Sequence, residues 1–592
     1  MSKTIRIGCA AGFYGDSQLS ARQLVDKGNI DYLVFDYLAE ITMAILAKQK
    51  AKDDNMGFAL DFVTVAMKDV LADCAAKGIK VVANAGGVNV PACIAALEQL
   101  CRSQNLDLKI GGVYGDDLLG REDLPVAEMV ENQTGEALPG KLASMNAYLG
   151  ARPIADALAA GADVVVTGRV VDSAVMLGPL LHEFGWGEAD YDLLAQGSLC
   201  GHVIECGAQC TGGNYTDWHT VPDFSDISYP IAEVSADGSF VISIPEGSGG
   251  LATVGSVGEQ ILYEIGDPGN YLLPDVACDF SNVQLEQVGV DQVRVSGARG
   301  RAPGNRYKVC ATWRDGFQIK GCIMIGGLRA LDKARTALEA WVKRVRDHYA
   351  ANGIPDFREV NLEYLGAEHT FGPHATSAAR GTREVVAKFG LHHDDPAALQ
   401  FAANEMVYLG TSGVPGFYGL GGGRVRPGAL MRVHSTLIDK SFITVTVQVG
   451  EALIAEHPYL TETESEPVPK YRLAVDEPDS SGDTVQVSLE QLAFARSGDK
   501  GNNANIGVLA RDAAYLPYIH RQLTAQAVED YFSYLVQGEV ERFELPGMGA
   551  FNFFLTEALG GGGAASVRTD AQGKSMAQQL LSIEITVPAG LV

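Results

Sequence analysis

The stretch KVVANAGGVNVPACIAALEQLCRSQNLDLKIGGV, residues 80–113, decides the fold. Residues 80–83 and 108–113 are strand-like apolar runs, and residues 91–104 between them have the 3.6-residue period of a helix. Pro91 stands at a first-turn position, where a helix does not need its amide. A strand, a covering helix and another strand in this order are typical of a parallel sheet.

The same alternation extends through the first 170 residues. Further strands are predicted at 4–8, 32–35 and 163–167, and further helices at 17–27, 38–52, 58–77 and 153–160. Repeated alternation of this kind predicts an α/β fold with a doubly wound, mostly parallel sheet in the N-terminal part.

The pattern changes after about residue 200. Short β-like pieces with many Gly, Pro and Asp turns follow, broken by one clear helix at 331–350, and a proline-rich acidic stretch without apolar periodicity comes next. The last hundred residues predict strands at 485–494, 506–509, 540–545 and 581–587, with helices within 515–535. We therefore divide the chain into an α/β core domain at 1–229, a mixed α+β portion packed on the core at 230–456, a linker at 457–484 and a C-terminal α+β domain at 485–592.

Charge and composition exclude several classes of partner. The 592 residues include 46 Lys and Arg against 73 Asp and Glu, a formal net charge of -27, which would repel nucleic acids and anionic membranes. No apolar run approaches the roughly 20 residues that span a bilayer, and residues 1–7 lack the pattern of a signal peptide. The ten scattered cysteines favour a reducing cytoplasm, and base rates favour a homo-oligomer.

Polar and glycine-rich loops follow the predicted parallel strands, where ligands bind in open α/β sheets. They occupy residues 8–16, 36–40, 84–89, 115–117 and 167–173. Glycine amides there can approach an anion closely, although Gly and Asn also simply end strands. The candidates for anion or substrate binding are Gly12, Gly15, Asn84, Gly86, Gly87 and Asp116, and the candidates for catalysis are Arg169 and Asp172. The spacing Gly8, Gly12, Gly15 does not match a dinucleotide fingerprint, so no nicotinamide cofactor is expected.

The segment 202–219 holds the densest set of catalytic residue types. His202 and Glu205 suit a general base and its orienting partner, or together with Asp217 and His219 they could hold a divalent metal. The spacing of the cysteines lacks the Cys-x-x-Cys pair of structural zinc sites, and we assign no metal.

The sharpest local motif is ARSGDKGNNANIG, residues 495–507. Successive Gly and Asn residues form concave amide nests, and Lys500 adds a positive charge, which together predict an anion cradle. Its candidates are Ser497, Gly498, Asp499, Lys500, Gly501, Asn502 and Asn505. A wide loop between hairpin strands is the alternative. Residues 560–574 are candidates for the facing wall, and glycines 419–423 with Arg424 and Arg426 are a further candidate phosphate seat.

Several of these motifs resemble the acyclic terpene utilisation family, the AtuA-like proteins. The likeness rests on residues 146–151, 161–172, 205–214, 263–268 and 497–507, and covers nearly the whole chain. The resemblance implies a ferredoxin-like C-terminal domain.

It also implies an association with enzymes that break down citronellol and geraniol as coenzyme A thioesters. We therefore expect a hydratase or lyase on an acyl-CoA thioester, with coenzyme A as part of the substrate and no other cofactor. The alternatives are a non-catalytic ligand-binding or assembly subunit of the same breakdown, and a metal-dependent hydrolase.

Overall fold

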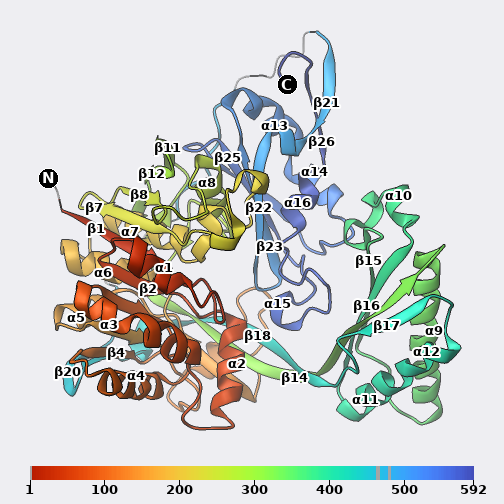
Figure 1. Cartoon of the computed structure of the whole chain (residues 1–592), viewed down its shortest axis with the longest axis horizontal. Helices are drawn as coiled ribbons and strands as arrows, with labels where there is room; N and C mark the ends of the chain where they lie inside the picture. Colours follow the sequence, from red (N-terminus) through yellow and green to blue (C-terminus); the bar gives the residue numbers. More distant parts are fainter. Residues whose placement is uncertain (1–2, 462–466, 476, 478–481) are drawn as a thin grey trace.

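The structure is a computed structural model, and it describes residues 3–461, 467–475, 477 and 482–592. The predicted linker at 457–484 therefore lies partly outside the described residues. Figure 1 shows a large N-terminal body, a smaller lobe built on a second sheet, and the C-terminal domain lying against both.

An eleven-stranded sheet forms the large body, in the order β11-β12-β8-β7-β1-β2-β3-β6-β4-β19-β20. Its five central strands are parallel: β1 (Thr4–Cys9), β2 (Tyr32–Phe35), β3 (Lys80–Ala83), β6 (Val164–Thr167) and β4 (Ile110–Tyr114). The antiparallel strands are β7 (Ile231–Ser235), β8 (Phe240–Ser243), β11 (Gln284–Gly289), β12 (Gln292–Ser296), β19 (Val445–Val449) and β20 (Ala452–His457). The parallel centre confirms the predicted fold class, while residues on both sides of the predicted 229/230 boundary share this one sheet.

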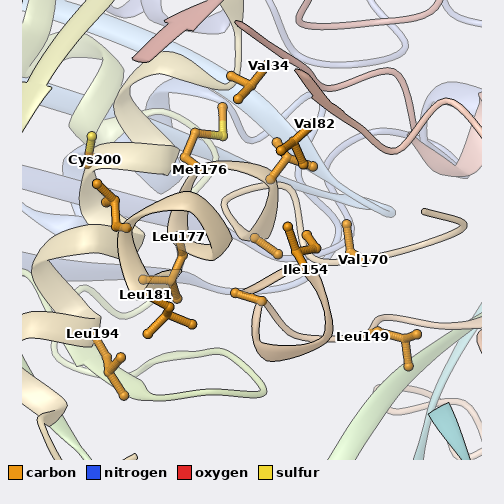
Figure 2. Packing of buried hydrophobic residues seen from close by; sticks show 14 of the residues in the cluster. Val34, Val82, Leu149, Ile154, Val170, Met176, Leu177, Leu181, Leu194 and Cys200 are labelled. Atoms are coloured by element: carbon orange, nitrogen blue, oxygen red, sulfur yellow. The ribbon is translucent and has the colours of Figure 1, made fainter. Parts of the chain in front are cut away.

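Two hydrophobic cores cover the two faces of the parallel strands. Val82 and Val165 point into one core, while Val81 and Val164 point into the other, as the two-residue period of a strand requires. Figure 2 shows the first core, where Val34 and Val82 meet side chains such as Met176 and Leu177. Its helices are α5 (Arg152–Ala159), α6 (Ala174–Phe184) and α7 (Tyr191–Ile204). The opposite face carries α1 (Ser20–Lys27), α2 (Glu40–Lys50), the π-helical turn Phe62–Met67, α3 (Lys68–Lys77) and α4 (Val90–Gln104).

The 21-residue strand β14 (Arg306–Gly326) joins the large body to the smaller lobe (Figure 1). Its first half pairs with β5 (Leu142–Ala147) and β18 (Gly428–Asp439), and its second half pairs with β16 (Glu384–His393) and β17 (Phe417–Gly421). β15 (Glu359–Leu365) completes this six-stranded sheet. The lobe's helices are α9 (Ala330–Ala351), α10 (Ser377–Arg380), α11 (Pro396–Glu405) and α12 (Leu409–Ser412).

The C-terminal domain is α+β, as predicted, but its opening motif is not a wide loop. Residues 495–507 belong almost entirely to a tight hairpin of β22 (Ala493–Lys500) and β23 (Asn503–Ala510). The four-stranded sheet runs β22-β23-β25-β24, with β24 (Val540–Leu545) and β25 (Ala550–Leu555). Around it lie β21 (Thr484–Ser488), β26 (Glu584–Pro588), α13 (Leu516–Gln522), α14 (Ala525–Tyr531), α15 (Gly562–Ala565) and α16 (Met576–Leu580).

Buried polar contacts fix the C-terminal domain to the large body through α8 (Val254–Leu262) and the turn that follows it. Arg496 forms an ion pair with Glu259 at 3.0 Å, and both side chains are buried. A small sheet of β9 (Tyr271–Leu272), β10 (Ala277–Asp279) and β13 (Arg299–Arg301) lies nearby in sequence. Among the described residues, no helix has the length and apolar character needed to cross a membrane.

Candidate functional site

Charged side chains from all three parts of the molecule meet beyond the carboxyl ends of the parallel strands. The charges of Asp172 and Glu40 help to raise the pKa of Lys500 in the C-terminal hairpin, and the charge of Lys500 lowers the pKa of Glu205. The Lys500 side chain is 44% exposed and lies 3.7 Å from Glu264, so small molecules can reach the charges gathered around it. We call this site the charged recess, formed by Asp36, Glu40, Tyr148, Arg169, Asp172, Glu205, Glu264, Lys308, Asp499, Lys500 and Lys574.

Arg169 is the buried cation of the recess. It follows β6, and its backbone amide donates to Asp116 Oδ2 at 2.8 Å. Its guanidinium lies over the Tyr148 ring at 4.0 Å, and Nη1 donates to Asp172 at 2.5 Å. The side chain is only 3% exposed, and its Nε has no hydrogen-bond partner. An unpaired donor on a buried guanidinium is costly, so it marks a place where a ligand acceptor would be stabilising.

Tyr148 links Arg169 to a second cation. Its ring has Lys308 of β14 at 4.6 Å, and its hydroxyl donates to Glu40 at 2.7 Å. Lys308 also donates to Glu40, at 3.2 Å. Burial alone would raise the pKa of Glu40, but Lys308 and Arg169 outweigh it and hold that pKa well below its ordinary value. Glu40 is therefore a fixed anion that orients the two cations.

Three carboxylates face one another in the recess. Burial raises the pKa of Asp36 well above its ordinary value, and the charges of Asp172 and Glu205 raise it further. Asn84 donates to Asp36 and accepts a hydrogen bond from the Tyr37 amide at 2.7 Å, so its side chain positions Asp36. Asp36 therefore holds its proton more tightly than a free carboxyl group does, which suits it to acid–base chemistry.

His202 and Glu205 form the predicted pair. Nδ1 of His202 lies 3.1 Å from Glu205 Oε1, and Nε2 lies 3.1 Å from the carbonyl of Ile261. The carbonyl can only accept, so Nε2 carries a hydrogen, and a second proton is shared between Nδ1 and Glu205. Burial raises the pKa of Glu205, against the opposing effect of His202. The pair can therefore store and release one proton at the wall of the recess.

Glu264 connects two lysines across the domain joint. Its carboxylate accepts from Lys574 at 2.9 Å and lies 3.7 Å from Lys500. Burial alone would raise the pKa of Glu264, but Lys500 and Lys574 hold it below its ordinary value. Its backbone has a φ of 57°, an unfavourable conformation for a non-glycine residue, and its amide donates to Asn505 at 2.9 Å. Burial and the charge of Glu264 raise the pKa of the neighbouring Asp499 to about 6.

The amides of the glycines predicted to bind an anion have partners within the protein. The Gly12 amide donates to Asp16 and the Gly15 amide to Asp61. Those of Gly86 and Gly87 donate to backbone carbonyls. A side chain at position 12 would overlap the backbone of Cys206, so Gly12 permits close packing there instead.

Asp116 and most of the 497–505 motif serve structure as well. Asp116 anchors the amide of Arg169, and the Ser497 hydroxyl joins the backbone of residues 573 and 577. Gly501 and Asn502 form the hairpin turn, with Asn502 accepting from the Gly561 amide, while Gly498 packs against residues 263–264. Asn505 binds Leu262 and Asn552. These groups are therefore engaged in contacts within the protein. Of the motif, Asp499 and Lys500 remain at the recess.

The structure does not assemble the possible metal set of segment 202–219. Asp217 forms a two-point ion pair with Arg511 at 2.6 Å, and His202 is occupied as described above. Within the described ranges, no group of three or more His, Cys, Asp or Glu residues is arranged to hold a metal ion. Burial raises the pKa of the Cys206 thiol well above its ordinary value, which disfavours a thiolate nucleophile.

The sequence did not indicate every member of the recess. Lys308 lies outside the motifs noted in the sequence, and only the folding of β14 brings it to Glu40. Glu264 and Lys574 occur in segments already noted, residues 263–268 and 560–574, but their convergence on Lys500 needed the tertiary structure.

Comparisons with protein families agree with this architecture. The family model of the acyclic terpene utilisation protein AtuA matches residues 5–449, and that of the AtuA ferredoxin-like domain matches residues 487–586. No curated protein and no solved structure matches the chain. The two matches include both halves of the charged recess, and together they show that the chain belongs to the acyclic terpene utilisation family AtuA.

Proposed function

We propose that the charged recess catalyses a hydratase or lyase reaction on an acyl-CoA thioester in the breakdown of acyclic terpenes or branched acyl chains. The observation that carries the proposal is the unpaired Nε donor of the buried Arg169 guanidinium beside the carboxyl groups of Asp172 and Glu205. The family's role in acyclic terpene utilisation supports the substrate class.

Both reactions need the same set of groups. In hydration, a base takes a proton from water, the hydroxyl oxygen bonds to C3, and the electron pair of the C2–C3 double bond moves onto the thioester oxygen. An acid then protonates C2. In the lyase reaction, a base takes the proton of a 3-hydroxyl group, C3 becomes a carbonyl as the C2–C3 bond breaks, and the electron pair of that bond forms the enolate of the shortened thioester. An acid then protonates this enolate at C2. Each therefore needs a base, an acid and a cation for the enolate oxygen.

The residues divide naturally among these tasks. Arg169 and Lys500 supply the positive charge for the enolate oxygen, and Glu205 with its partner His202 accepts or returns the proton. Asp36, whose pKa burial raises, is a second acid–base group beside Asp172. Asp116, Asn84 and Glu40 act as positioning residues.

The test is incubation of the pure protein with branched enoyl-CoA and 3-hydroxyacyl-CoA thioesters, followed by mass spectrometry for gain of water or cleavage. Arg169→Lys keeps the charge but loses donors, and we expect at least a tenfold loss of kcat/KM, about 1.4 kcal/mol of transition-state stabilisation. Glu205→Gln should lower kcat similarly. Arg102→Lys, on the exposed end of α4, is the matched control and should be unaffected.

The outcomes separate enzyme from subunit. Binding of the thioesters without conversion would favour the non-catalytic ligand-binding alternative. Conversion that survives Arg169→Lys and Glu205→Gln unchanged would move the reaction away from the recess.

A further inference from the structure

A cavity of about 720 Å³ lies between the smaller lobe and the C-terminal domain. We call it the interdomain pocket. One wall comes from the start of α9, from β15 and from residues 367–380, and the other from residues 534–535, 558–559 and 568–579. Its volume lies within the range of about 300–1,000 Å³ of small-molecule sites.

Three arginines line the pocket without a carboxylate partner. In the part of the chain that the structure describes, Arg335, Arg380 and Arg568 form no salt bridge. Arg335 lies over the Tyr364 ring at 5.5 Å, and the Arg568 guanidinium donates to the carbonyl of Ala558 at 2.7 Å. In a chain with a net charge of -27, three unpaired guanidiniums around one cavity favour an anionic ligand.

The carboxylates around the pocket have other partners. Glu363 accepts from Lys388 at 2.7 Å and from Thr569, and Glu368 accepts from the Thr376 amide at 2.7 Å. Asp570 accepts from the amides of residues 574 and 575. Asp332 lies in the first turn of α9, where the helix dipole stabilises a negative charge. The arginines therefore remain available to a ligand.

The rest of the lining suits a flat ring with a donor at its edge. Leu331, Leu535, Leu559 and Met576 provide apolar surface. Asn361 Oδ1, on the wall formed by the smaller lobe, is buried without a hydrogen-bond partner. Since a buried acceptor without a partner is costly, a ligand that brings an N–H to this carbonyl would be stabilised. An adenine amino group has this chemistry.

The pocket and the charged recess share the loop of residues 566–575. Arg568 and Asp570 line the pocket, while Lys574 of the same loop binds Glu264 in the recess. Two of the loop's carbonyls accept from lysines of the smaller lobe: Lys320 binds Ser566 at 2.7 Å and Lys388 binds Val567 at 2.6 Å. The 566–575 loop thus contributes residues to both the interdomain pocket and the charged recess.

We propose that the interdomain pocket binds the phosphorylated adenosine end of coenzyme A, with the phosphates on the three arginines and the adenine at Asn361. This inference rests on the proposed function, since it supplies the handle of the thioester whose acyl end enters the recess. Remote binding of this kind raises turnover by holding the reacting end in place.

The probe is adenosine 3′,5′-bisphosphate, titrated calorimetrically into the full chain. We expect saturable binding that weakens at least tenfold in the double variant Arg335→Gln, Arg380→Gln, whose side chains are exposed and not part of the core. The double variant Arg306→Gln, Arg314→Gln carries the same charge change at exposed positions of β14 outside the pocket, and should bind as the unaltered protein does. Asn361→Leu should weaken the nucleotide but not inorganic phosphate.

Each result bears on the proposal. It is overturned by a lack of nucleotide binding, by equal weakening in both double variants, or by inorganic phosphate binding as tightly as the nucleotide, which would indicate a simple anion site. Turnover of the coenzyme A thioester against the shorter pantetheine thioester separates the two claims. Nucleotide binding without turnover retains the pocket and rejects the hydratase or lyase. Equal turnover of both thioesters without nucleotide binding retains the hydratase or lyase and rejects the pocket as a nucleotide site.

Discussion

Asp116 shows how a buried carboxylate serves a site without touching a ligand. It accepts hydrogen bonds from the Arg169 amide and from Asn146, and so fixes the position of the Arg169 backbone. Burial nevertheless raises its pKa to about 7, because the charged form loses its hydration. The position of Arg169 is thus maintained at a cost in stability that depends on pH.

The raised pKa of Asp116 determines how the stability of the protein changes with pH. Because the folded state binds the Asp116 proton more tightly than the unfolded chain does, its stabilising contribution is complete below about pH 4 and is lost as the pH rises to about 7. Each unit of pKa difference corresponds to about 1.4 kcal/mol. The Asp116→Asn variant lacks this titration. The difference between its unfolding free energy and that of the unaltered protein should therefore shift in favour of the variant as the pH rises from 4 to 7.

Denaturant unfolding at several pH values measures the effect. Asp107→Asn, which removes the same charge from an exposed residue, is the matched control. Parallel pH curves for Asp116→Asn and the unaltered protein would mean that Asp116 titrates alike in both states.

Among the elements, the β22–β23 hairpin determines the shape of the recess. Gly498 lies where a Cβ atom would stand 2.5 Å from Glu264 Cγ and 2.6 Å from the Tyr263 ring. Gly498→Ala should therefore push Glu264 off its two lysines, and it should destabilise the protein by about 1–3 kcal/mol, as overpacking does.

The thermal unfolding midpoint tests this, with Gly140→Ala as the matched control. Gly140 is exposed and has no atom within 4 Å of an added Cβ, so its variant should unfold at the usual temperature. An unchanged midpoint for Gly498→Ala would show that the hairpin can shift away from residues 263–264.

The elements also show what sequence reasoning can reach. Residues 32–35 and 80–83 were predicted as strands to the residue, because short valine-rich runs between helices admit little else. The 495–507 hairpin was mistaken for a cradle, since its Gly and Asn residues suit a loop as well as a strand packed closely against another domain. Arg169, Asp172, His202, Glu205 and Lys500 do meet, but Lys308 and Glu264 join them only through long-range packing.

At the scale of the whole molecule, the Arg496–Glu259 pair holds the C-terminal domain against the large body. Glu259 is fully buried, and Arg496 is its only ionic partner among the described residues. Arg496→Met leaves an uncompensated buried charge, so we expect a loss of about 3–5 kcal/mol of stability. Removing both charges in Arg496→Met, Glu259→Met should restore part of it.

Urea denaturation of the single and double variants measures this coupling. Arg294→Met breaks an exposed pair with Glu286 and should cost about 1 kcal/mol or less. If the double variant is no more stable than Arg496→Met, then lost packing, and not the stranded charge, governs the joint.

The length of β14 determines how far the smaller lobe lies from the C-terminal domain, and so determines the width of the interdomain pocket. Inserting one residue would turn every later side chain of the strand to the opposite face. Inserting two would preserve the faces but carry the smaller lobe outward by about 7 Å, drawing Lys320 away from the carbonyl of Ser566. Natural lengthening of the chain is therefore expected in the surface turns and not in this strand, whose span sets how far apart the two ends of a bound molecule can lie.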